Sequence, residues 1–201
     1  MKKVLIVIGI LLVVGVIAFF LFGDNYGKLM KEYGPLVEPR VSEVADQKML
    51  EYKGTGDPNQ VAMVAYKSLF NVYYSLSGVD KMKAVAPKAR WPEVDINKKG
   101  EWVGLYGVPV PDSITELPAG VDPNIQLVTW KYGTVAEILH IGPYSEETAN
   151  IEKLKKFITD SGYKIAGAHE EDYIKGPGMF GAGNTKKYLT IIRYQITKTK
   201  K

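Results

Sequence analysis

Residues 134–162, TVAEILHIGPYSEETANIEKLKKFITDSG, contain the pattern that decides the fold: a strand, a Gly-Pro turn and an amphipathic helix. Thr134–His140 is the expected strand, and Gly142-Pro143 interrupts it. A helix is expected from Ser145, with two glutamates in its first turn, where the helix dipole favours acidic residues. Its apolar face comprises Ile151, Leu154, Phe157 and Ile158, and Gly162 ends it.

The same order of elements occurs earlier in the chain. Gln47–Tyr52 is an expected strand, and a helix follows from Asp57, which can cap it, and Pro58, which suits the first helical position. The remaining expected strands are residues 103–108, 125–131, 163–168 and 188–194.

Two connections complete the expected fold. Tyr132-Gly133 predicts a hairpin between the strands at 125–131 and 134–140, and the proline-rich segments 86–100 and 109–123 are expected to be loops. Strand, helix, strand, strand, repeated once, predicts an α+β domain built from a duplicated β-α-β-β unit. Its antiparallel sheet should carry two helices on one face. A cleft between the halves is where a small ligand would bind.

An uncharged apolar run, Val4–Phe22, is long enough to span a bilayer as a helix. Bulky phenylalanines occupy the positions where a cleaved signal peptide needs small residues, so we expect an uncleaved transmembrane anchor. Lys2 and Lys3 favour a cytoplasmic N-terminus and an extracytoplasmic domain. The expected organisation is an anchor at 1–23, a linker at 24–40 with a short helix around Tyr26–Tyr33, and one globular domain at 41–201.

The composition excludes several classes of site. The chain has 201 residues and no cysteine, which rules out disulfides, thiolate catalysis and cysteine metal sites. His140 and His169 are its two histidines, too few for a histidine-based metal centre, so we expect no metal and no cofactor. The net charge of +4 is interspersed rather than gathered in a basic stripe, so no nucleic-acid partner is expected.

The C-terminal third resembles a known family. The elements H-I-G-P-Y at 140–144, a helix ending at Gly162-Tyr163, E-D-Y-I-K-G-P at 171–177 and T-I-I-R-Y-Q-I at 190–196 are similar to those of the GyrI-like small-molecule-binding domain. That domain is also the effector-binding module of multidrug-sensing and AraC-type regulators. Gln195 replaces the usual proline, and no DNA-binding helix-turn-helix precedes the domain. The resemblance implies a duplicated fold with a ligand cleft between its halves.

The resemblance also implies a site. Glu171 matches the glutamate that meets cationic ligands in an apolar pocket, and a buried carboxylate must find a counter-charge or become protonated. Tyr173 follows two residues later and should share its sheet face. A register slip of one residue would place Glu170 there instead. Tyr144, Tyr106 and Trp102 are the other candidate ligand-binding residues.

Several functions are compatible with these residues. The first is membrane-tethered binding of hydrophobic or cationic small molecules. The alternative is a hydrolase of reactive small molecules, in which Glu171 activates water and Tyr173 assists proton transfer. A protein-interaction module, or a haem site with His140 or His169 as axial ligand, is also conceivable. We expect His140 to bond the backbone of its turn and His169 to be exposed.

Overall fold

The computed structural model describes residues 25–82, 85–93, 102–177 and 183–199. The chain divides into two compact units between Pro35 and Leu36. The helix α2 (Tyr26–Tyr33) lies in the first unit and confirms the short helix expected there. The expected membrane segment Val4–Phe22 lies outside the described residues. Within them, no helix combines the length and the apolar character that a membrane crossing requires.

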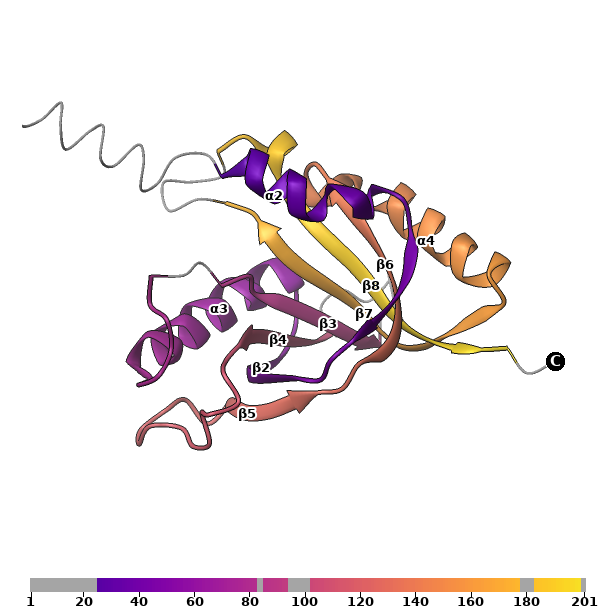
Figure 1. The fold of residues 1–201 in the computed structure, drawn as a ribbon. Coiled ribbons are helices and arrows are strands. Elements are labelled where there is room, and N and C mark those ends of the chain that lie inside the picture. The colour runs from indigo at the N-terminus through magenta and orange to yellow at the C-terminus, as the bar shows by residue number, and fades with distance from the viewer. Residues whose placement is uncertain (1–24, 83–84, 94–101, 178–182, 200–201) are drawn as a thin grey trace, which may run out of the picture. The chain divides into compact units, whose positions relative to one another are not determined.

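Eight described strands of the second unit form one antiparallel sheet in the order β1-β6-β8-β7-β3-β4-β2-β5 (Figure 1). The strands are β1 (Arg40–Val44), β2 (Gln47–Thr55), β3 (Lys88–Glu93), β4 (Val103–Pro109), β5 (Ile125–Trp130), β6 (Gly133–Ile141), β7 (Tyr163–Lys175) and β8 (Leu189–Lys198). The helical elements are α3 (Pro58–Ser75), α4 (Thr148–Asp160) and the 3₁₀ turns η1 (Gly34–Val37), η3 (Tyr144–Glu146) and η4 (Thr185–Lys187). The helix expected from Ser145 is therefore η3 followed by α4.

The sheet is built from two halves with the same chain order, β2-α3-β3-β4 and β6-α4-β7-β8, which meet where β3 pairs with β7. Two further strands each pair with the other half. β1 precedes β2 in the chain but pairs with β6, and β5 precedes β6 but pairs with β2. The expected hairpin between 125–131 and 134–140 is therefore wrong. A short connection that contains a glycine allows a tight turn, but it does not determine that the two strands it joins pair with each other. Here the crossing buries Trp130 and Tyr132 against Met49 and Val135.

β3 was not expected, because residues 86–100 looked like a proline-rich loop. Lys88 and Arg90 point to one side of this strand and Ala89 and Trp91 to the other, an alternation only four residues long within a segment that contains two prolines. The two charges are neutralised by the neighbouring β7, where Lys88 lies opposite Asp172 and Arg90 lies opposite Glu170. The loop assignment is thus wrong over 88–93, and an ion-paired strand joins the two halves.

Both long helices cover the same face of the sheet. α3 packs on β2 and β4, and α4 packs on β6, β7 and β8. One row of residues crosses the sheet on this face, and it consists of Ile125, Tyr52, Tyr106, Ala89, Glu171, Ile192 and Ile138. Tyr106 and Ala89 belong to the apolar core under α3, and Ile192 and Ile138 to the core under α4. Glu171 lies in this row between the two cores.

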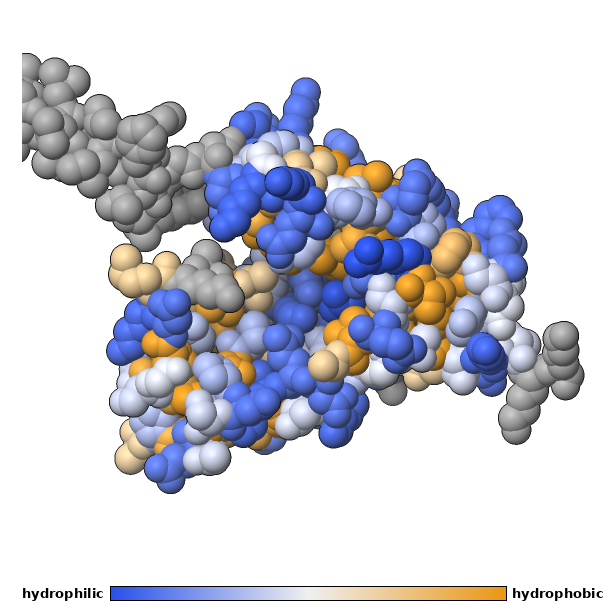
Figure 2. All heavy atoms as spheres, viewed as in Figure 1, coloured by the Kyte–Doolittle hydropathy of each residue, from blue (hydrophilic) through white to orange (hydrophobic). Residues whose placement is uncertain are grey.

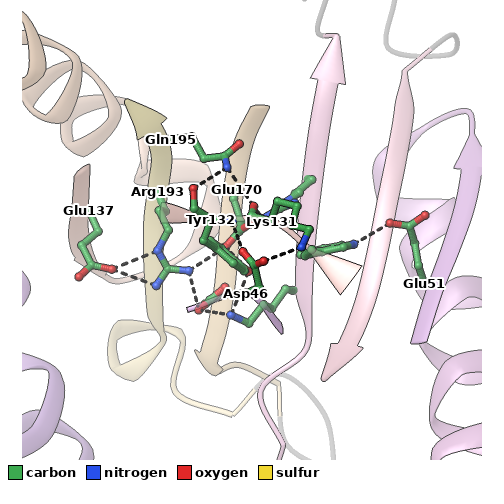
Figure 3. Close-up of polar contacts among 12 residues, drawn as sticks. Asp46, Glu51, Lys131, Tyr132, Glu137, Glu170, Arg193 and Gln195 are labelled. Carbon is green, nitrogen blue, oxygen red and sulfur yellow. Dashed lines mark hydrogen bonds and ion pairs between the residues drawn. The ribbon is translucent and has the colours of Figure 1, made fainter. Parts of the chain in front are cut away.

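The opposite face carries a row of alternating charges across five strands. Arg90, Glu170, Arg193, Glu137 and Arg40 lie opposite one another on β3, β7, β8, β6 and β1 in turn, and we call these five residues the charge ladder. Arg193 is its centre, with Nη1 2.7 Å from Glu170 Oε1 and Nη2 2.9 Å from Glu137 Oε2 (Figure 3). Arg90 pairs with Glu170 from the other side.

The centre of the ladder is buried, and its charges are paired. Arg193, Glu170 and Glu137 are each less than a tenth exposed. Burial alone would lower the pKa of Arg193, but the carboxylates of Asp172, Glu170 and Glu137 raise it above its usual range, so the guanidinium stays charged. Hydrophilic side chains gather in the hollow of this face over β3, β7 and β8 (Figure 2). The cavity among the ladder residues measures about 40 Å³, far below the size of a site for an organic ligand.

The ladder allows a matched test of how much its buried charges contribute to stability. Arg193→Leu should lower the free energy of unfolding by about 3–5 kcal/mol, because it removes the central counter-charge that three buried carboxylates share. Arg40→Leu also removes a partner of Glu137, but the side chain of Arg40 is 54% exposed, so its loss should cost no more than about 1 kcal/mol. Equal, small losses in denaturant unfolding would contradict the assignment.

Candidate functional site

A cavity of about 660 Å³ opens on the helix face of the sheet, within the size range of small-molecule sites. α3 contributes Pro58, Asn59, Ala62, Met63, Tyr66 and Phe70 to its lining. The other half contributes Tyr144, Glu147, Glu171, Tyr173, Gly176 and Pro177, and the β3 region adds Pro87 and Trp91. The cavity therefore lies between the two halves and draws its walls from both.

Glu171 reaches this cavity because side chains alternate along a strand. Glu170 and Asp172 point to the ladder face, so the residue between them points to the helix face. Glu171 is 9% exposed there, and its Oε1 lies 2.7 Å from His169 Nε2. His169 Nδ1 lies 2.8 Å from the hydroxyl of Tyr194. A neutral histidine satisfies both contacts when it accepts from Tyr194 and donates to Glu171. His169 is therefore half-buried and bonded, and its expected exposure is wrong.

A series of tyrosines surrounds the carboxylate. The Tyr173 ring packs edge-on against Tyr66 at 6.1 Å and against Tyr144 at 5.5 Å between ring centroids. Burial, and then the charge of Glu171, raises the pKa of Tyr173 well above its usual value. Burial likewise raises the pKa of Tyr66 and of Tyr144. These phenols stay neutral at physiological pH and offer ring faces and edges to a ligand.

Two glycines position Tyr144. Gly142 has φ +138°, a conformation that side-chain-bearing residues rarely adopt, and it turns the chain from β6 towards η3. Gly176 lets the two segments approach closely, since a Cβ atom built there would lie 2.6 Å from the Tyr144 hydroxyl. The Gly-Pro turn after β6 and the Gly-Pro pair after β7 thus meet at the same ring. His140 Nε2 lies 3.1 Å from the carbonyl oxygen of Pro143, in agreement with its expected structural role.

The other expected site residues lie elsewhere. Tyr106 is 2% exposed and packs edge-on behind Tyr66, at 5.6 Å between ring centroids, so it supports the cavity wall without lining it. Burial raises the pKa of Tyr106 to about 12. Trp102 is half-buried against the core under α3 and does not line the cavity. Among the described residues, no cluster of three or more histidines and acids is placed to hold a metal ion.

The sequence argument missed a second carboxylate. Glu147 precedes α4 at its N-cap position, but its side chain does not bond the helix N-terminus. It lines the cavity instead, is 5% exposed, and its Oε1 has no hydrogen-bond partner within the described structure. Burial first, and the charge of Glu171 second, raises the pKa of Glu147 to about 9. The cavity thus holds a second carboxyl group beside Glu171, and this second group keeps its proton at neutral pH.

The aromatic wall from α3 was also missed. Ala62, Tyr66 and Phe70 recur every four residues, beside the buried stripe of Ala65 and Leu69. That spacing could have indicated a second apolar stripe facing something other than the sheet. Trp91 lies on the unexpected strand β3, where its ring packs 5.6 Å from that of His169.

The cavity lining contains no lysine or arginine among the residues that the structure describes. The basic residues of the β3–β7 region, Lys88, Arg90 and Arg193, point to the ladder face. Lys175 ends β7 but is not part of the lining. Two glutamates therefore meet an aromatic cavity in which this part of the chain supplies no permanent positive charge.

Comparison with known proteins identifies the fold. No protein-family model matches the sequence, and neither does any curated protein. A hydrolase from Listeria innocua has the same fold, with a TM-score of 0.65 at 22% identity over 86% of this chain and 98% of that chain. The C-terminal domain of EcmrR gives a TM-score of 0.63 at 15% identity over 81% and 98% of the two chains.

A third solved structure carries a ligand. SAV2435 bound to tetraphenylphosphonium gives a TM-score of 0.50 at 15% identity, over 80% of this chain and 94% of that chain. At these identities the similarities show a shared fold alone. That fold is the duplicated α+β domain that the resemblance in the sequence implies.

The raised pKa of Glu147 predicts a pH dependence of stability. The folded protein keeps this proton up to a pH of about 9, whereas an unfolded glutamate loses it near about 4.3. The free energy of unfolding should therefore fall as the pH rises between these values, by at most about 1.4 kcal/mol per pH unit. Glu147→Gln should lack this slope in urea unfolding from about pH 5 to pH 9.

A control for this measurement lies on the same helix. Glu152→Gln changes an exposed glutamate of α4 and should keep the wild-type slope. Parallel pH profiles for the wild type and Glu147→Gln would show that Glu147 is not the group that holds the proton.

Proposed function

We propose that this domain binds hydrophobic cations in the cavity between its halves, with Glu171 as the counter-ion. The observation that carries the proposal is the placement of a buried carboxylate in an aromatic cavity whose described lining has no lysine or arginine. A buried charge is costly unless it is paired. His169 donates one hydrogen bond to Glu171, but the described lining supplies no permanent positive charge to pair with the carboxylate.

A lipophilic cation satisfies both properties of the cavity. Its charge neutralises Glu171, and the faces of Tyr66, Tyr144 and Trp91 offer cation–π attraction of about 0.5–2 kcal/mol per favourable contact. Its apolar groups cover Phe70 and Met63, and each Å² removed from water contributes about 25 cal/mol. The ligand-bound state of SAV2435, which has a similar fold and holds a cation of this class, supports the same choice of ligand.

Glu171→Gln should weaken tetraphenylphosphonium binding roughly tenfold or more, about 1.4 kcal/mol, because the isosteric amide keeps the shape but removes the counter-charge. Quenching of tryptophan fluorescence reports binding, since Trp91 lies in the cavity wall. Glu152→Gln is the matched control and should bind as the wild type does. Neutral triphenylphosphine oxide should bind the wild type and Glu171→Gln equally. An unchanged affinity of Glu171→Gln for the cation would exclude the carboxylate as counter-ion.

A hydrolase is the second candidate, and the position of a protonated Glu147 in the same cavity as Glu171 favours it. Glu171, hydrogen-bonded to His169, could activate a water molecule, while protonated Glu147 or Tyr173 could donate a proton. The substrate would have to be a reactive electrophile, because the described cavity offers no nucleophile triad. Turnover of such compounds that disappears in Glu171→Gln would favour catalysis over simple binding.

We also propose that the apolar run Val4–Phe22 tethers the domain to a membrane, with the domain on the extracytoplasmic side. Lipophilic cations concentrate at membranes, so tethering would place the cavity near its ligands. The full-length chain should remain with membranes after alkaline carbonate extraction and should be digested by protease added outside intact spheroplasts. A chain without residues 1–23 should be released. Release of the full-length chain by carbonate would contradict tethering.

A further inference from the structure

We propose that Glu147 is a second cation subsite of this cavity, so that a compact dication binds with one charge at Glu171 and the other at Glu147. Glu147 gives its proton to the solvent when the second charge arrives. The proposal rests on the proposed function, because it requires that Glu171 binds the first charge.

The geometry separates Glu147 from an ordinary helix-capping glutamate. It occupies the N-cap position of α4, where a side chain would normally bond the free N–H groups of the first turn. No such bond forms, and the buried side chain lines the cavity together with Glu171. Its Oε1 is without a hydrogen-bond partner in the described structure. A buried polar atom of this kind is costly unless something completes its bonding.

The groups around Glu147 do not supply a positive charge. Those that influence it or are influenced by it are Glu171 and Tyr173 on β7, Tyr144 on η3 and Thr190 on β8. Beyond Glu171 lies His169, and across the cavity from α3 lies Tyr66. Protonation is therefore how Glu147 stays neutral beside a second carboxylate when the cavity holds no dication.

The net charge of the two glutamates predicts different behaviour for monocations and dications. Two carboxyl groups that hold one proton between them carry one negative charge, which a monocation neutralises without any proton movement. A dication leaves an excess positive charge unless Glu147 ionises. Binding of the dication should thus release one proton to the solvent and should strengthen as the pH rises. Binding of the monocation should change little with pH.

Two matched probes test this on the full chain. Benzyltrimethylammonium carries one permanent charge, and p-xylylenebis(trimethylammonium) carries two on the same ring. From about pH 7 to pH 9, the dissociation constant of the dication should fall roughly tenfold per pH unit, and that of the monocation less than about threefold. Calorimetry in buffers of different ionisation enthalpy should detect about one proton released per dication at about pH 7.

Glu147→Gln is the decisive variant. It keeps the volume of the side chain but cannot ionise, so the dissociation constant of the dication should no longer depend on pH, whereas the control Glu152→Gln should keep the wild-type pH dependence. A pH dependence of dication binding that survives in Glu147→Gln would assign the proton to another group, such as His169, and overturn the proposal. So would equal pH profiles for the two probes in the wild type.

The outcomes also separate this proposal from the proposed function. If the monocation binds through Glu171 but the dication releases no proton, the second subsite falls and the proposed function stands. If neither probe nor tetraphenylphosphonium binds the wild type, both fall.

Discussion

Strand alternation at three consecutive acids of β7 is the constraint on which the rest of this structure depends. Glu170 and Asp172 turn to one face of the sheet, where Arg90, Lys88 and Arg193 neutralise them. Glu171 turns to the other face, where the described cavity lining has no basic residue. One strand thus contributes both to the ionic junction between the halves and to the unpaired charge between them. A shift by one residue would reverse the two roles.

The charge ladder does more than join β3 to β7. A buried ion pair is not in itself strong evidence for stability, because desolvation opposes the attraction. Its value here is specificity, since each position of the row has a partner of opposite sign only in this register. The ladder also holds the guanidinium and ammonium groups near the junction on the far face. The cavity can therefore keep a net negative charge in surroundings of low dielectric, where that charge attracts cations most strongly.

The parts of the fold that follow a local rule could be predicted from the sequence. The apolar stripe of α4 and the Gly-Pro turn after β6 needed only helical spacing and turn chemistry. The choice of Glu171 over Glu170 came from the family resemblance, and the register of β7 in the structure places Glu171 on the helix face. The pairing of β5 with β2 could not be predicted, because the alternation of apolar residues along a strand does not show which strand lies beside it. β3 was missed because the acids that neutralise Lys88 and Arg90 lie 84 and 80 residues further along the chain.

The site followed the same division. Glu171, Tyr173 and Tyr144 all belong to the C-terminal third of the chain, whose motifs resemble the family, so the resemblance indicated all three. Glu147 was recognised only as an acid in the first turn of a helix, where the dipole alone would keep it ionised. Its position became informative only once α4 was placed over Glu171, because burial and a neighbouring negative charge outweigh the helix terminus. The proton on Glu147 thus depends on its closeness to Glu171 in the fold, which a local stretch of sequence does not reveal.

The two halves are alike in topology but not at the point where they meet, and this explains why one cavity rather than two would bind a ligand. The row Tyr52, Tyr106, Ala89 in the first half corresponds to Ile138, Ile192, Glu171 in the second, and Ala89 lies directly opposite Glu171. A second acid in place of Ala89 would confront Glu171 with a like charge at a distance where one of them must be neutralised. The small apolar side chain avoids this, and the first half contributes the aromatic residues of α3 instead. The two similar halves thus form the two walls of the cavity. The difference between Glu171 and the equivalent Ala89 makes one wall charged and the other apolar.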